Sequence, residues 1–142
     1  MAVHFSVQGQ IELYPPVPLA QLWELTEIGR FEVAPHGASE TDLAALTDRA
    51  KWVLVPDADS GTDDQGRPNR IRYLRVRDLS IQSPAINHRL RDLSAWMGAD
   101  HEFDGELRFS GDSPGDVGVI EPYEDGDWPE WHTTGGRFGD PS

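Results

Sequence analysis

Histidine and carboxylate residues are close to one another in the sequence between positions 101 and 116. His101, Glu102 and Asp104 are ligand types that zinc and manganese accept. These residues also fall on an expected strand, where His101 points to one face while Glu102 and Asp104 point to the other. We therefore favour an acidic strand face, whose carboxylates pair with arginines of the segment 70–77, over a metal site.

Asp112 and Asp116 flank a Ser-Pro-Gly turn and have the oxygen chemistry that calcium prefers. The segment lacks the dense ligand spacing and the closing glutamate of an EF-hand loop, so we interpret both residues as turn formers. A second carboxylate group falls in an expected solvated loop from residue 57 to residue 69. Its members are Asp57, Asp59, Asp63 and Asp64. His101, Asp112 and Asp116 thus remain weak metal candidates, and no metal or cofactor is expected.

The sequence contains no recognisable catalytic motif. Loop serines occur at positions 39, 60 and 113, but none lies in a Gly-x-Ser-x-Gly turn, and the five histidines are scattered singly. A phosphate-binding Gly-x-x-x-x-Gly-Lys loop and a Gly-x-Gly-x-x-Gly loop are both missing. The chain has no cysteine, which excludes disulfides, thiolate metal sites and thiol nucleophiles. No catalytic residue is assigned, and an enzyme is not the favoured function.

Aromatic residues gather in the C-terminal segment from residue 125 to residue 142. Trp128, Trp131 and Phe138 lie beyond the last expected strand, although such side chains are costly to leave in water. Two interpretations remain open: the tryptophans fold back to cover an edge of the sheet, or they dock on a partner. We favour the first. Truncation after Asp125 should then lower the melting temperature.

Charge is unevenly distributed along the chain. The net charge of −13 divides into −8 for residues 1–66, +5 for residues 67–92 and −10 for residues 93–142. Such a field repels nucleic acid and anionic membranes and attracts basic protein surfaces. We therefore expect a protein partner with a basic surface, no direct nucleic-acid binding and no membrane association. The expected partner-binding residues are Trp128, Trp131, Glu102, Asp104 and Glu106.

Hydrophobic periodicity predicts most of the strands. Residues 3–13 alternate with period two, and Tyr14-Pro15-Pro16 should end that strand because proline cannot donate to the ladder. Further strands are expected at 31–33, at 52–55 and at 70–77, the last with a bulge between Tyr73 and Leu74. Residues 102–110 should form one strand, joined in a hairpin to 117–120 by the turn 111–116.

Two or three helices are expected. Pro18 should begin a helix that ends near Gly29. Ser39 resembles an N-cap for an uncertain helix at residues 43–46. The clearest helix begins after an N-cap at Ser83 and ends at Gly98. Its apolar stripe consists of Ile86, Leu90, Leu93 and Met97.

Together these elements predict a single α+β domain at residues 1–124, followed by an acidic tryptophan-containing tail at residues 125–142. The domain should contain a mainly antiparallel sheet with two or three helices packed on one face, in a variant of the ferredoxin-like fold. A chain of 142 residues can bury one sizeable core. The absence of an export signal, of a long apolar run and of cysteine favours a soluble cytoplasmic protein.

Several strand and turn segments resemble an uncharacterised family of small acidic proteins from actinobacteria and their phages. They are Val7-Gln8-Gly9-Gln10-Ile11-Glu12-Leu13-Tyr14-Pro15-Pro16, Phe103-Asp104-Gly105-Glu106-Leu107, Gly111-Asp112 and Gly115-Asp116-Val117. The resemblance transfers no catalytic residue. It implies an actinobacterial or phage source and a structural or regulatory role, and the preference for arginine over lysine agrees with that source.

The expected function is therefore that of a non-catalytic acidic interaction protein, such as a phage- or mobile-element-encoded inhibitor or accessory factor that binds a basic protein surface. The alternative is a small metal-dependent or small-molecule-processing enzyme that uses the region 101–116. The oligomeric state and the identity of the partner do not follow from the sequence.

Overall fold

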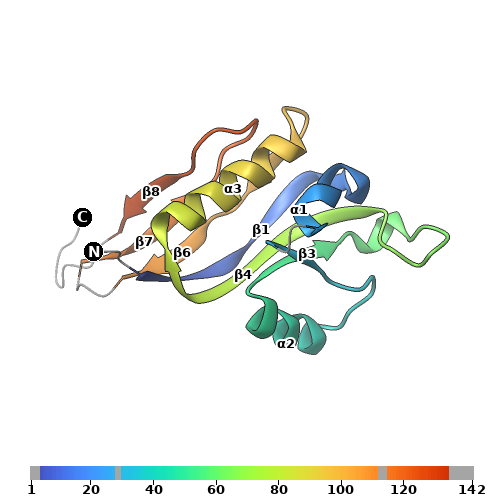
Figure 1. The fold of residues 1–142 in the computed structure, drawn as a ribbon, viewed down its shortest axis with the longest axis horizontal. Coiled ribbons are helices and arrows are strands. Elements are labelled where there is room, and N and C mark those ends of the chain that lie inside the picture. Colours follow the sequence, from blue (N-terminus) through green and yellow to red (C-terminus); the bar gives the residue numbers. More distant parts are fainter. Residues whose placement is uncertain (1–3, 28–29, 112–114, 135–142) are drawn as a thin grey trace.

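A computed structural model describes residues 4–27, 30–111 and 115–134. These residues form an α+β structure in which helices pack on a mixed, mostly antiparallel sheet (Figure 1). The strands are β1 (His4–Pro18), β2 (Glu32–Val33), β3 (Trp52–Pro56), β4 (Arg70–Gln82), β5 (Glu102–Asp104), β6 (Leu107–Ser110), β7 (Val117–Glu121) and β8 (Glu130–Thr133). The helices are α1 (Trp23–Glu27), α2 (Glu40–Ala50) and α3 (Ser83–Met97), and 3₁₀ turns occur at Leu19–Leu22 and Ala58–Ser60. No helix in the described residues is long and apolar enough to cross a bilayer.

The strands follow the order β2-β3-β4-β1-β6-β7-β8, and β5 pairs with β1 beside β6. The β2–β3 pair is parallel, whereas the other pairs between these strands are antiparallel. The long strand β1 therefore lies in the middle of the sheet. It pairs with β4 along one side and with β5 and β6 along the other.

The first strand continues through its prolines, so the prediction that Pro15 and Pro16 end it is wrong. A register shift between Glu12 and Val17 carries the proline segment past β4 without ladder bonds, and pairing resumes at Val17 with Ile71. An irregular step of this kind is where a strand can hold residues that lack an N–H donor.

The fourth strand is longer than predicted and runs to Gln82. It contains the expected irregularity, but at a different place. Tyr73 and Leu74 pair in regular succession with β1 and β3, and the register shifts between Ile71 and Tyr73. The extra residue is Arg72, and it lets Ile71 and Leu74 both face the core.

The prediction for α3 is confirmed in its buried face. Ile86, Leu90, Leu93 and Met97 are all buried in the main core. The helix ends at Gly98, whose φ of 80° is readily adopted by glycine. The N-cap prediction is wrong: Ser83 is already helical, Gln82 occupies the cap, and Pro84 lies in the first turn.

The uncertain helix is real and begins at the predicted cap, since the Ser39 hydroxyl oxygen accepts the N–H of Asp42. This helix, α2, overturns the prediction that the helices share one face. Trp52 and Leu54 join the core beneath α3, while Val53 and Val55 point the other way and pack with Leu46 of α2. Successive residues of a buried strand face opposite sides, so β3 carries helices on both faces.

The C-terminal strands differ from the predicted pattern in number. The expected strand 102–110 is divided into β5 and β6 at Gly105, which has a φ of 123°. The hairpin of β6 with β7 is confirmed, although residues 112–114 of its turn lie outside the described residues. The sequence does not predict β8, which pairs with β7 and forms an edge of the sheet.

Candidate interaction surface

One face of the sheet is largely open to solvent. Helix α3 covers the opposite face, and α2 covers the open face only over β3 and the adjoining part of β4 (Figure 1). On β1 and β6, apolar residues such as Val7 and Leu107 point into the core, so Gln8 and Arg108 point to the open face and are exposed. We call this surface the open face.

A row of polar side chains crosses three adjacent strands of the open face. Arg77 on β4 pairs with Gln8 on β1, and Gln8 pairs on its other side with Arg108 on β6. The next row contains Arg75 opposite Gln10. These residues line a groove with a volume of about 740 Å³ between α2 and the sheet.

The other end of the open face is acidic. Phe103 packs against the core, so its neighbours Glu102 and Asp104 are exposed on the open face. Further along, Glu121 of β7 lies directly opposite Glu130 of β8. The acidic strip, as we define it, comprises Glu102, Asp104, Glu106, Glu121 and Glu130.

Ion pairs to arginine are confined to the first part of the chain. Among the described residues, carboxylates up to residue 92 supply every ion pair with arginine. They are Glu12 and Asp57 with Arg72, Glu32 with Arg49, Glu40 with Arg75, Asp48 with Arg77, Asp63 with Arg67 and Asp92 with Arg30. The described carboxylates from Asp100 to Glu130 have no arginine or lysine partner within that part of the chain, and only His132 lies near Glu121 and Glu130. Negative charge is therefore left uncompensated on the acidic strip.

The prediction that Glu102 and Asp104 pair with arginines of the segment 70–77 is wrong for a topological reason. Strand β1 lies between β5 and β4, so these carboxylates and arginines are two strands apart. The arginines of β4 turn instead to α2 and to the adjacent strand. The guanidinium of Arg75 donates two hydrogen bonds, of 2.6 and 2.7 Å, to the carboxylate of Glu40. These bonds hold the pKa of Glu40 below its usual value.

The loop carboxylates have local structural roles. Asp57 is buried and accepts a hydrogen bond from the hydroxyl of Ser60. Asp63 accepts the backbone N–H groups of Gln65 and Arg67 and the side chain of Arg67. The backbone N–H of Arg67 contributes most to lowering the pKa of Asp63. All of these hydrogen bonds join residues of the loop itself, so they stabilise its conformation.

The weak metal candidates do not come together. The ring Nδ1 of His101 lies 2.6 Å from the carbonyl oxygen of Pro15, and the neighbouring carboxylates face the open side of the sheet. The backbone carbonyl of Asp116 accepts the N–H of Gly111, whereas Asp112 lies outside the described residues. Across residues 4–27, 30–111 and 115–134, no three histidine or carboxylate side chains are grouped as metal ligands.

The two tryptophans of the C-terminal segment lie in different environments. Trp131 packs against Phe5 and Phe109 with ring centroids 5.2 and 4.8 Å away, and its indole N–H donates to Asn87 of α3. Trp128 is 51% exposed and lies against the outer side of α3, beneath the guanidinium of Arg91. The predicted partner-binding residues thus separate: the three carboxylates lie on the open face, Trp131 is partly buried against the core and Trp128 lies on the helical side.

Sequence reasoning missed the row formed by Arg77, Gln8 and Arg108. Alternation on each strand was sufficient to assign these residues to the polar face, but only the strand order brings β4, β1 and β6 together. No family model, curated protein or solved structure matches the chain.

Proposed function

We propose that this chain is a non-catalytic interaction protein that binds a basic protein surface through its acidic strip, as an inhibitor or accessory factor. The observation that supports this most directly is the separation of charge. Many carboxylates up to residue 92 pair with arginines, whereas no carboxylate of the strip has an arginine or lysine partner among the described residues. A partner supplying lysine or arginine would provide the missing counter-charges.

The position of the strip favours docking of a macromolecule. It lies on an open sheet face, so a partner reaches it without any rearrangement of the core. Tyr14 pairs with Glu102 across β1 and β5 and is 58% exposed. Tyrosine is enriched at protein interfaces, where it contributes apolar area together with a hydroxyl group. Complementary charge accelerates association and selects the partner, and the tyrosine adds contact area.

The test uses a fluorescein-labelled decalysine peptide and fluorescence anisotropy with the full chain. One variant combines Glu102→Gln, Asp104→Asn and Glu106→Gln. A control variant with the same change in charge combines Glu24→Gln, Asp59→Asn and Asp64→Asn. We expect the strip variant to bind at least about tenfold more weakly at low salt, and the control to stay within about threefold of the parent chain.

Salt provides a second readout of the same binding. Raising NaCl to about 0.3 M should weaken the parent complex strongly, because exposed charges are screened over roughly 10 Å or less. Equal losses in the two variants would mean that only net charge matters, and a salt-independent affinity would mean that the attraction is not electrostatic. Either result would remove the acidic strip as the site.

We also propose that β3, β4, β1 and β6 form a variant of the ferredoxin-like fold. Support comes from the antiparallel order of these four strands and from the helical connections, α1 after β1 and α3 after β4. The resemblance to the actinobacterial and phage family implies an actinobacterial or phage source and a structural or regulatory role, which agrees with an inhibitor or accessory factor.

A further inference from the structure

The groove at the other end of the open face has a different chemistry from the acidic strip. Its arginines come from β4 and β6, and Gln8 lies between Arg77 and Arg108 in the register. Neighbouring strands are about 4.8 Å apart, which places the backbones of the two arginines roughly 10 Å from each other. Side chains of this length can approach one group above Gln8 from both sides.

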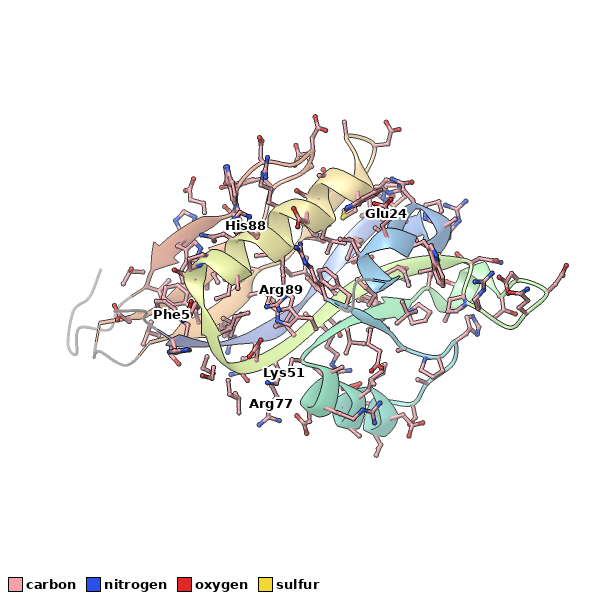
Figure 2. The ribbon with its side chains drawn as sticks, in the orientation of Figure 1. Phe5, Glu24, Lys51, Arg77, His88 and Arg89 are labelled. Atoms are coloured by element: carbon pink, nitrogen blue, oxygen red, sulfur yellow. The ribbon has the colours of Figure 1, made fainter. Side chains whose placement is uncertain are left out.

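The guanidinium groups of this groove are accessible to an anionic ligand, although the net charge of the chain is negative. Arg108 is exposed and has no hydrogen bond or ion pair within the described residues. Arg77 has an exposed partner in Asp48, at 2.9 Å. Exposed pairs contribute only about 0–1 kcal/mol, so an incoming anion can replace Asp48 at little cost. Lys51 lies next to Arg77, since its backbone carbonyl accepts the N–H of Arg77, and both residues lie beside the end of α2 (Figure 2).

One arginine in the wall of this groove already binds an oxyanion, the carboxylate of a glutamate from α2. Arg75 in its wall already binds the carboxylate of Glu40 through two parallel hydrogen bonds. This forked geometry matches carboxylate and phosphate groups equally well. The side-chain amide of Gln8 can donate to the same group or accept from a hydroxyl next to it.

We propose that this groove is a binding site for a small molecule carrying a phosphate or carboxylate group, held between Arg77 and Arg108 above Gln8. A volume of about 740 Å³ lies within the range of small-molecule sites. Asp48 and Glu106 also line the groove, and Glu106 is the member of the acidic strip that borders it. A long polyanion would meet these carboxylates, so the site selects a compact ligand.

The test is calorimetric titration of the full chain with inorganic phosphate and, separately, with succinate, at constant ionic strength set by chloride. Saturable binding is expected for at least one of the two anions. Arg108→Gln should weaken it at least about tenfold, since it removes one charge-assisted interaction. Arg49→Gln is the control, because it makes the same change in charge on the far side of α2, where Arg49 pairs with Glu32. Tighter binding of phosphate would indicate a phosphate ester as ligand, and tighter binding of succinate a dicarboxylate.

A second variant, Gln8→Glu, keeps the test decisive if Arg108→Gln folds poorly. It places a carboxylate between the two guanidinium groups and should abolish binding of both anions. Absence of saturable binding to the parent chain, or equal weakening by Arg49→Gln, would overturn the proposal. Arg108→Gln should leave decalysine binding intact, and the strip variant should still bind the anion, so this site and the acidic strip fail or succeed separately.

Discussion

At the scale of single residues, Gly118 shows how closely the C-terminal strands approach one another. A Cβ atom at this position would lie 2.0 Å from the carbonyl oxygen of His132 and 2.8 Å from the Phe109 ring. We expect Gly118→Ala to destabilise the fold by about 1–3 kcal/mol, because β8 or the ring must move. Gly115→Ala is the matched control, since no atom lies within 4 Å of its added Cβ. Urea denaturation measures both, and equal stabilities would contradict the register of β7 with β8.

Tyr123 offers a prediction in pH. Its hydroxyl donates a 2.7 Å hydrogen bond to the carboxylate of Glu121, and this bond raises the pKa of the phenol to about 12. The neutral phenol is thus favoured in the folded chain, so its contribution to stability is complete below the ordinary tyrosine pKa of about 10 and is lost as pH rises through 12. Absorbance titration of tyrosinate should show one late-titrating group, and Glu121→Gln should shift it to lower pH. An identical titration curve in that variant would remove the hydrogen bond as the cause.

Residue patterns in the sequence were sufficient for positions whose role is set by local alternation. Val7, Ile11 and Leu13 are buried as expected, because period two on a strand assigns a face without knowledge of its neighbours. The partners of charged residues were not predictable in this way. Glu40 and Arg75 are far apart in the chain and meet only because α2 packs across β4.

At the scale of elements, α3 supplies much of the core. Leu90 is 1% exposed, and we expect Leu90→Ala to lower the free energy of unfolding by about 2–5 kcal/mol. The chain offers a matched control in Leu79, which is 61% exposed, so Leu79→Ala should cost less than about 0.5 kcal/mol. Denaturant titration that gave similar losses for the two leucines would show that the buried face of α3 is wrongly assigned.

The packing of β8 against the rest of the fold depends on Trp131, which lies in the strand, more than on Trp128, which precedes it. Trp131 packs on two core aromatics, whereas Trp128 is half exposed. We expect Trp131→Ala to cost about 2 kcal/mol or more and Trp128→Ala less than about 1 kcal/mol.

Truncation after Asp125 removes β8 and should lower the melting temperature by at least the shift seen for Trp131→Ala, at about 3–5 °C per kcal/mol. A truncated chain that melts like the parent would instead make the segment a docking arm.

Elements were predictable where their own residues define them and less so where neighbours do. The stripe of α3 and the cap of α2 are local signals, and both are confirmed. The strand β8 has four residues and only one partly buried apolar side chain, so its pairing with β7 is what defines it. The assignment of α2 to the opposite face was likewise not readable, because Trp52 to Val55 are buried on both sides and carry no alternation.

At the scale of the whole molecule, attraction and repulsion between charges act over different distances. The arginine pairs lie within 4 Å and are screened little by salt, while the carboxylates from Asp100 to Glu130 repel one another over longer distances. A net charge of −13 therefore opposes folding at low ionic strength.

We expect added NaCl to stabilise the chain in the absence of any partner. Raising the ionic strength from about 0.01 to about 0.15 M shortens the screening length from roughly 30 to roughly 8 Å, which removes most of the long-range repulsion. The melting temperature measured by calorimetry should rise by a few degrees.

The strip variant, Glu102→Gln with Asp104→Asn and Glu106→Gln, should melt higher at low salt and gain less from NaCl. A second variant neutralises three paired carboxylates, through Glu40→Gln, Asp48→Asn and Asp63→Asn, and it should not melt higher, because each change also removes an attraction to arginine. A melting temperature that falls with NaCl, or the same response in both variants, would show that the uncompensated charge is not concentrated on the acidic strip.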